Sequence, residues 1–237
     1  MPKIAFKKQE TCDKKYYIID KDSFIVSNRV AWLPEFCEES EIIFKIKENS
    51  EGYFDFSKVI IDIGAEDGSY TTLIDWAGGH MFEPNKSMCC LCYANMYLKD
   101  KIDNFYVHNC ALDSKPGEMV FDGFSIKDGG TYKQATPNLF NGGDRAIETK
   151  TLDSFNISNV GLIKVDVEGM EYNVLLGGIG TIVRNNFPPI LFECWDVGEY
   201  GFTEEKRDRL FGLIKGLGYE IIEKWGNKIT HLAIRKR

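Results

Sequence analysis

The fold is decided by residues 62–69, Asp62-Ile63-Gly64-Ala65-Glu66-Asp67-Gly68-Ser69. This stretch joins an apolar run, Val59 to Ile63, to a segment with helical spacing that starts at Ser69. An apolar run broken by one acidic residue is typical of a parallel strand buried on both faces. Glycines at a strand–helix turn let the backbone approach a ligand closely. The stretch therefore predicts an α/β sheet whose first strand ends at a ligand-binding turn.

The glycine spacing distinguishes this turn from two familiar phosphate-binding turns. Gly64 and Gly68 do not fit the pattern G-x-G-x-x-G, and no Gly-Lys-Ser/Thr follows as it would in a P-loop. Asp62, just before the turn, would repel a pyrophosphate, but its carboxylate can accept hydrogen bonds from the ammonium group of an amino acid. The turn therefore favours the methionyl end of S-adenosylmethionine over a dinucleotide.

A second acidic residue supports the same cofactor. Glu83 stands in Phe82-Glu83-Pro84-Asn85, at the end of the next expected strand. It follows Asp62 by about 20 residues, the spacing at which an acidic side chain binds the ribose hydroxyls in folds of this kind. A tight strand–helix turn without a ligand is the simpler alternative for the glycine pattern alone. The position of Glu83 favours cofactor binding.

Apolar runs and helical spacing alternate along the rest of the chain, which is the signature of an α/β layer fold. An antiparallel hairpin is expected at the end, with Gly226-Asn227 in its turn. The prediction is a mostly parallel seven-stranded sheet that this hairpin closes. We expect helices over 35–47, 69–77, 85–98, 171–176 and 203–217, and strands over 59–63, 80–83, 104–108, 119–121, 146–149, 160–167, 189–195, 219–225 and 228–235.

Two segments interrupt this alternation. Residues 1–56, with an expected hairpin at 16–26 and an amphipathic helix, are interpreted as a small N-terminal appendage to a Rossmann-like domain at 57–237. Residues 122–145 are rich in Gly, Asn and Asp, and a loop of this length inside a compact domain is usually functional or mobile. Its aromatic residues Tyr132 and Phe140 are candidates either for stacking on a sugar or for packing within the loop.

Composition narrows the possible partners. The 237 residues are 43% hydrophobic and 27% charged, which is ordinary for a globular protein. The net charge of −7 opposes an extended nucleic-acid footprint, which needs clustered Lys and Arg. No apolar run reaches the ~18 residues of a membrane span, and no signal segment follows the Lys-rich start. The seven cysteines lack the paired spacing of a zinc module, so we expect reduced thiols and a cytoplasmic location.

Four blocks of residues resemble the FkbM family of S-adenosylmethionine-dependent methyltransferases. The most specific is Leu162-Ile163-Lys164-Val165-Asp166-Val167-Glu168-Gly169-Met170-Glu171, close to the family signature I-K-x-D-x-E-G-x-E, and Ile190 to Glu193 matches the strand that follows. The resemblance implies a Rossmann-like class I methyltransferase fold and an acceptor hydroxyl on a sugar or other small molecule. The cofactor-binding residues expected from the turn and the matching blocks are Asp62, Gly64, Ala65, Gly68, Ser69, Tyr70, Glu83, Pro84, Asn85, Asn109, Ala111 and Asp166.

Three carboxylates are the candidates for catalysis. Asp166 is expected at the carboxyl end of the fourth core strand, Glu168 in the turn that follows, and Glu193 at the end of the neighbouring strand. Converging there, they would deprotonate a hydroxyl or hold Mg²⁺ or Mn²⁺, with Asp166 and Glu193 as the ligands. Glu168 has an alternative role as a helix cap. Lys164 is interpreted as a structural ion-pair partner of Asp166.

Two further functional classes stay open at this stage. A nucleotide-dependent oxidoreductase or epimerase would also use a Rossmann sheet, but the G-x-G-x-x-G turn is missing and a terminal antiparallel hairpin is expected. A non-catalytic module that keeps the fold is the other alternative. The sequence names neither the acceptor nor the oligomeric state.

Overall fold

The computed structural model describes residues 38–121, 145–199, 201–225 and 227–235. The hairpin expected at 16–26 and the segment 122–144, with Tyr132 and Phe140, lie outside these ranges. Within them, no helix has the length and apolar character needed to cross a bilayer.

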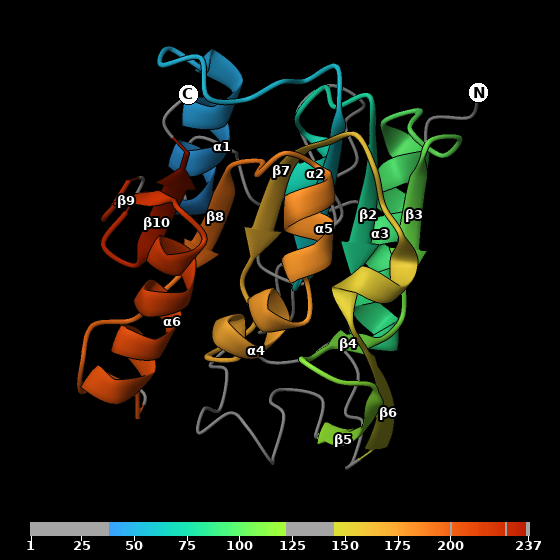
Figure 1. Ribbon diagram of the computed structural model, residues 1–237. Helices are drawn as coiled ribbons and strands as arrows, with labels where there is room; N and C mark the ends of the chain where they lie inside the picture. The colour runs from blue at the N-terminus through green and yellow to red at the C-terminus, as the bar shows by residue number, and fades with distance from the viewer. Residues whose placement is uncertain (1–37, 122–144, 200, 226, 236–237) are drawn as a thin grey trace, which may run out of the picture.

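A seven-stranded sheet forms the centre of the protein, with the strand order β3-β2-β1-β7-β8-β10-β9 (Figure 1). The first five strands in this order pair in parallel, whereas β10 is antiparallel to both of its neighbours. The predicted closing hairpin is therefore confirmed, with its second strand inserted next to β8. The strands are β1 (Val59–Ile63), β2 (Gly78–Phe82), β3 (Phe105–His108), β7 (Val160–Val165), β8 (Ile190–Glu193), β9 (Glu220–Ile222) and β10 (Thr230–Ile234).

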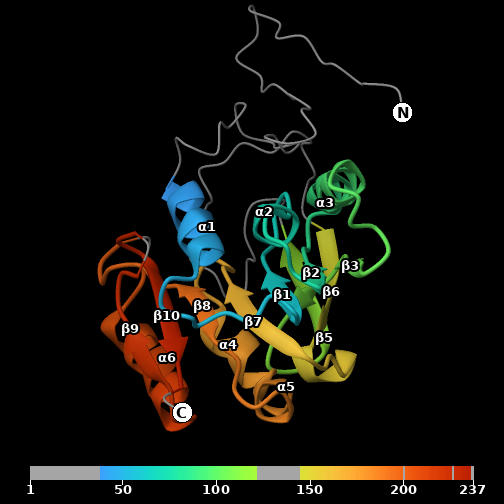
Figure 2. The same ribbon diagram turned by 90° about the horizontal axis from the view of Figure 1, so that it is seen from above.

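Helices cover both faces of the sheet, as Figure 2 shows. One face carries α1 (Glu38–Glu48), α2 (Ser69–Thr72) and α3 (Lys86–Leu98), and the other carries α4 (Glu171–Leu176), α5 (Ile179–Arg184) and α6 (Glu204–Gly216). Each face has its own apolar core, because strand residues alternate between the faces. Ile60 and Leu162 lie in the first core and Ile61 and Ile163 in the second. The sheet is thus buried on both sides, as the apolar runs predicted.

A second, three-stranded sheet lies at the carboxyl edge of the main sheet, with the order β4-β6-β5 (Figure 1). Its strands are β4 (Ala111–Leu112), β5 (Gly117–Phe121) and β6 (Arg145–Lys150), and a short 3-10 helix, η2 (Leu152–Phe155), leads back to β7. The strands expected at 119–121 and 146–149 are confirmed and pair antiparallel. This small sheet thus lies at the edge where ligands bind in open α/β folds.

The helix predicted over 69–77 is wrong in length, because α2 ends at Thr72. Gly78 and Gly79 do not terminate that helix but form the first two residues of β2. A Cβ on Gly78 would lie 2.7 Å from Asn104 O, and one on Gly79 would lie 2.8 Å from the Phe105 ring. The two glycines are therefore needed because the neighbouring segments approach β2 closely. In the sequence alone, a pair of glycines after a helical segment also fits the end of a helix, which explains the wrong prediction.

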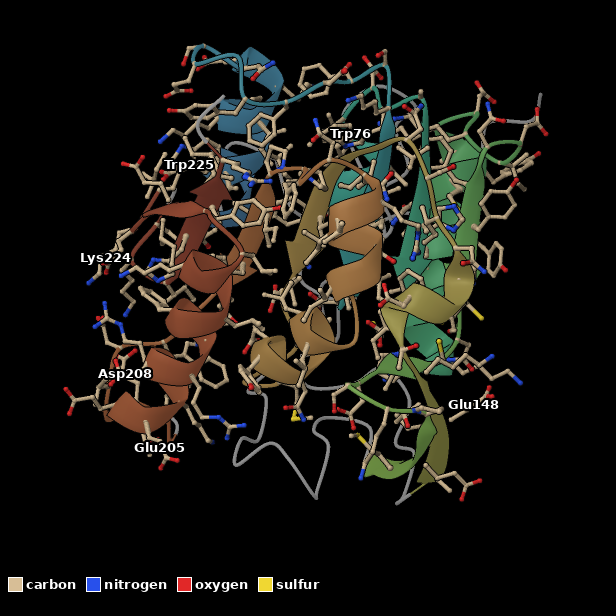
Figure 3. The ribbon with its side chains drawn as sticks, viewed as in Figure 1. Trp76, Glu148, Glu205, Asp208, Lys224 and Trp225 are labelled. Carbon is tan, nitrogen blue, oxygen red and sulfur yellow. The ribbon has the colours of Figure 1, made fainter. Side chains whose placement is uncertain are left out.

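Helix α1 packs against the main domain through its apolar residues. Ile42 and Ile46 are buried in the core beneath it, and Lys45 donates to Trp225 O while its ammonium group lies 4.3 Å from the centre of the Trp225 ring. Trp225 lies beside α1 in Figure 3, and its ring also meets Phe54 edge-on at 5.8 Å. This part of the chain shares a core with the sheet. The boundary at residue 56 stays a prediction.

The first testable prediction concerns the turn after β1. Gly64 has a φ of +72°, and a Cβ at this position would lie 1.7 Å from Asp166 O. We expect Gly64→Ala to lower the free energy of unfolding by more than the ~1–2 kcal/mol of a left-handed conformation alone, because the clash forces β1 and β7 apart. Urea unfolding followed by circular dichroism measures the change.

Gly212 in α6 provides a matched control, since a Cβ there meets nothing within 4 Å. Gly212→Ala is expected to raise the free energy of unfolding by about 0.5–1 kcal/mol, the helix preference of Ala over Gly. Equal stability of Gly64→Ala and the unsubstituted protein would contradict the close approach.

Candidate functional site

The turn after β1 and the turn after β7 meet at the carboxyl edge of the sheet. Asp166 N donates to Ile63 O at 3.0 Å, and Lys164 Nζ donates to Gly64 O at 2.7 Å. The predicted cofactor turn and the first predicted catalytic residue are thus linked by two hydrogen bonds. Parallel pairing of β1 with β7 brings these distant parts of the sequence together.

Lys164 lies between two carboxylates. Its Nζ is 3.4 Å from Asp62 Oδ1 and 3.5 Å from Asp166 Oδ2. The ion pair predicted between Lys164 and Asp166 is therefore confirmed, and Asp62 is a second partner of the same ammonium group. The Asp62 side chain is fully buried and also accepts a hydrogen bond from Thr71 Oγ1 at 2.9 Å. The Asp166 side chain is 34% exposed. Of the two carboxylates, therefore, only that of Asp166 is open to a reactant.

The burial of Asp62 bears on its predicted role. Oδ1 of Asp62 accepts no hydrogen bond and relies on the charge of Lys164, since 3.4 Å is long for an N–H···O bond. A direct contact between Asp62 and a cofactor ammonium group stays a prediction. The geometry gives Asp62 a second role, that of fixing Lys164 beneath the turn.

Glu83 connects the end of β2 to the cofactor turn. One carboxylate oxygen accepts from Glu66 N at 3.0 Å and the other from Asn85 N at 2.7 Å. Burial raises the pKa of Glu83 to about 8, although both backbone donors favour the ionised form. Each oxygen keeps a second lone pair, so the side chain still has acceptor capacity for hydroxyl groups.

Two side chains of α3 support the turn from behind, and both were missed by the sequence reasoning. Asn95, which is fully buried, donates from Nδ2 to Asp67 O at 2.7 Å, and Cys92 Sγ donates to Glu66 O at 3.3 Å. A buried polar residue on an apolar helix face was the available signal for Asn95, because such groups are almost always hydrogen-bonded.

The remaining predicted cofactor residues lie around this turn. Asn109 donates from Nδ2 to Glu83 O and Pro84 O, both at 3.0 Å, and so fixes the segment that follows β2. Ala111 is buried in β4 at the base of the small sheet. The residues placed in or directly beside the turn are Gly64, Ala65, Gly68, Ser69 and Tyr70; the Tyr70 ring centre lies 5.2 Å from Lys164 Nζ.

Asp166 and Glu193 converge, as the sequence predicted. Their side chains share a hydrogen bond, and burial together with the nearby charges of Asp166 and Glu168 raises the pKa of Glu193 well above its usual range. Two carboxyl groups at hydrogen-bond distance share a proton more readily than they both ionise. Glu193 is therefore the member of the pair that tends to hold the proton, and Asp166 lies beside the Lys164 ammonium group.

The turn between β7 and α4 is organised by Glu171. Its Oε1 accepts from Val167 N and Gly169 N, both at 3.1 Å, and burial raises its pKa to about 7. Glu168, between these donors, has a φ of +57°, which is uncommon for a non-glycine residue. The N-cap position of α4 is Met170, two residues after Glu168, so the structure does not place Glu168 at the helix cap. Glu171 lies in the first turn of α4, as predicted, and its carboxyl group accepts from the backbone of the preceding turn.

No group of three or more His, Cys, Asp or Glu side chains in the described ranges is arranged to hold a metal ion. The set of Asp166, Glu168 and Glu193 does not form such a group. Magnesium or manganese binding by Asp166 and Glu193 alone stays a prediction.

Strand order and the inserted antiparallel strand define the class of protein. Two solved structures share this fold over most of the chain, and the fold is the Rossmann-like fold of class I methyltransferases. The first is methyltransferase FkbM from Methylobacillus flagellatus KT, with a TM-score of 0.56, 16% identity, and coverage of 83% of this chain and 50% of that one. The second is a putative caffeoyl-CoA O-methyltransferase from Staphylococcus aureus, with a TM-score of 0.51, 11% identity, and coverage of 82% and 83%.

The sequence identifies the family within this class. The methyltransferase FkbM domain matches residues 62–221, so the chain belongs to the FkbM methyltransferase family. The 2-O-methyltransferase NoeI of Sinorhizobium fredii is 29% identical and aligns with 54% of this chain. The chain spans 60% of the length of NoeI and half the length of the Methylobacillus protein. The resemblance drawn from the motifs is thereby confirmed.

The second prediction tests the buried charges. We expect Lys164→Met to lower the free energy of unfolding by about 3–5 kcal/mol, because it leaves the Asp62 carboxylate buried without its counter-charge. The double variant Asp62→Asn, Lys164→Met should recover a large part of that loss. Urea unfolding of both single variants and of the double variant gives the coupling free energy between Asp62 and Lys164.

The control is an exposed pair of the same type. Lys224 Nζ lies 3.3 Å from Asp196 Oδ1, and both side chains are about half exposed. Lys224→Met should cost less than ~1 kcal/mol. A loss no larger for Lys164→Met than for Lys224→Met would show that the buried pair does not hold the two turns together.

Proposed function

We propose that this member of the family is an S-adenosylmethionine-dependent O-methyltransferase acting on a hydroxyl group of a sugar or another small molecule. The observation that carries the proposal is the position of Asp166. Its carboxylate is partly exposed, hydrogen-bonded to Glu193, and joined to the cofactor turn through Lys164 and Ile63 O. The relative NoeI is named as a 2-O-methyltransferase, which favours oxygen as the acceptor atom.

The residues of the first turn fit the proposed cofactor. Gly68 has a left-handed backbone conformation at the start of α2, where a Cβ would lie 2.8 Å from Met81 Sδ, and Glu83 has acceptor capacity for the two ribose hydroxyls. Lys164 places a positive charge beneath the turn, where a pyrophosphate would also find favourable contacts, but Glu66, Asp67 and Glu83 surround it with acid. This balance of charge favours a ligand with a cationic end over a dinucleotide.

When bound, the cofactor supplies an electrophilic methyl group on sulfur. Asp166 is assigned as the base that takes the proton of the acceptor hydroxyl, since its carboxylate is partly exposed at the edge of the sheet and lies 3.5 Å from Lys164 Nζ. Glu193 is assigned as a hydrogen-bond donor that holds Asp166 and orients the acceptor. Glu168, in the same turn, is assigned to acceptor contact. Lys164 acts as a positioning residue, because its ammonium group pairs with both Asp62 and Asp166 and holds the Asp166 carboxylate in place.

Two alternatives are less well supported. A nucleotide-dependent oxidoreductase lacks a basis in the turn sequence, and the antiparallel β10 beside β8 is foreign to a wholly parallel dinucleotide-binding sheet. A non-catalytic module would not need an acid with a raised pKa in contact with an exposed carboxylate at this edge. Mass spectrometry of ligands retained on purification separates the three: S-adenosylhomocysteine, a nicotinamide nucleotide or neither.

The third prediction concerns the cofactor. We expect calorimetry to detect S-adenosylhomocysteine binding, with Glu83→Ala weakening it by about 1–3 kcal/mol through loss of charge-assisted ribose hydrogen bonds. Glu148→Ala is the control, because Glu148 is an exposed residue of β6 whose carboxylate pairs only with Lys150 at 3.1 Å among the described residues (Figure 3). Equal affinity of folded Glu83→Ala and the unsubstituted protein would remove Glu83 from the site.

The fourth prediction concerns the chemistry. Asp166→Asn should leave S-adenosylhomocysteine affinity within about threefold and lower turnover by ~10²-fold or more, the usual contribution of a positioned base. Glu193→Gln should cost less, because glutamine keeps a donor and Glu193 is the protonated partner. Turnover is measured by methyl transfer to a sugar acceptor. A greater loss for Glu193→Gln than for Asp166→Asn would reverse the two roles.

A further inference from the structure

A small pocket lies between α4 and α6, beside the turn that carries Asp166 and Glu168. Its volume is about 200 Å³, and it is lined on the α4 side by Met170, Tyr172 and Asn173. The α6 side contributes Lys206 and Arg209, with Phe202 just before that helix. Pockets that enclose drug-sized ligands measure roughly 300–1,000 Å³, so this one suits a single sugar ring or one substituent.

The pocket and the carboxylate pair are joined by one turn. Gly169 and Glu171 line the pocket, and Glu171 Oε1 binds the backbone N–H groups of Val167 and Gly169. A Cβ on Gly169 would lie 3.7 Å from the Trp195 ring, two residues beyond Glu193. A ligand group in the pocket therefore lies next to the turn that carries Asp166, and that turn also approaches the segment after Glu193.

The charge of the pocket is opposite to that of the protein. The chain has a net charge of −7, yet two cationic side chains line this pocket. The Arg209 guanidinium lies 4.4 Å from the centre of the Tyr172 ring and forms no ion pair with the described residues. Stacking on tyrosine holds a guanidinium in a fixed orientation and leaves its N–H donors for an anion.

No described acid forms an ion pair with the Arg209 guanidinium. Asp208 points outward from α6 on the side away from α4, and Glu205 lies at the lower end of the helix (Figure 3). Glu171, whose carboxyl group is directed at backbone donors, has a pKa raised to about 7 by burial. The lining of the pocket therefore carries two cationic side chains, Arg209 and Lys206, and one carboxyl group, Glu171, which is directed at backbone donors.

We propose that this pocket binds an anionic substituent of the acceptor, a carboxylate or a phosphate, and so selects acidic sugars over neutral ones. The proposal rests on the proposed function, because it assigns a subsite next to the methyl-transfer centre. Arg209 forms the charge-assisted contact and Lys206 adds a second cation. Tyr172 holds the guanidinium over its ring.

The experiment measures sugar binding by ligand-observed NMR, with S-adenosylhomocysteine present. The probes are methyl β-D-glucuronide, glucose 6-phosphate and the neutral methyl β-D-glucoside. The two anionic sugars should bind at least about tenfold more tightly than the glucoside, and Arg209→Gln should remove that preference. Arg207→Gln is the matched control: Arg207 is on the same helix but pairs with Glu223 at 2.7 Å and does not line the pocket.

The outcomes separate the two proposals. Equal binding of the three sugars, or equal losses in Arg209→Gln and Arg207→Gln, overturns the anionic subsite while S-adenosylhomocysteine binding still supports the cofactor. Absence of S-adenosylhomocysteine binding overturns the proposed function instead. A preference for only one of the two anionic sugars, lost in Arg209→Gln, supports the subsite and identifies the substituent.

Discussion

The contact between the ends of β1 and β7 is the constraint on which the rest of the edge depends. Gly64 leaves no room for a side chain against Asp166 O, and Lys164 reaches under the turn to Gly64 O and the Asp62 carboxylate. Neither turn can move independently, because both backbone and charge connect them. The turn after β1 and the turn after β7, to which we assign the cofactor and the acceptor, are thus fixed relative to one another by a few buried atoms.

The burial of charge along this edge divides the acids into two kinds. Burial raises the pKa values of Glu83, Glu171 and Glu193, whereas Asp62 and Asp166 are both next to the Lys164 ammonium group. A single cation cannot compensate five nearby carboxylates in a medium of low polarity. The site therefore holds three acids with raised pKa values, two of which accept backbone hydrogen bonds, together with the partly exposed carboxylate of Asp166 beside Lys164. That difference is the condition for acid–base chemistry between neighbouring groups of the same type.

The sequence predicted the features that depend on local pattern and missed those that depend on close approach. The terminal hairpin, the Thr203 cap of α6 and the convergence of Asp166 with Glu193 all follow from periodicity, capping residues and parallel strand ends. Gly78 and Gly79 were misinterpreted because glycine has the same appearance at a helix end and at a crowded strand. Asn95 and Arg209 were missed because their partners are distant in the sequence, and no local pattern indicates which polar residue of a helix faces a turn or a pocket.

The position of α4 explains why acceptor recognition and catalysis can be tuned separately in this fold. The cofactor turn is supported by α3 through Asn95 and Cys92, on one face of the sheet, whereas α4 and α6 lie on the other face. A change in α6 alters the pocket without touching the contacts of Glu83 or Gly64. The only covalent path from the pocket to the reacting carboxylate is the turn of residues 166–171, which Glu171 holds from inside. Because that turn is rigid where it meets β7, different acceptors can be accommodated by the exposed side chains of α6 while the geometry at Asp166 is kept.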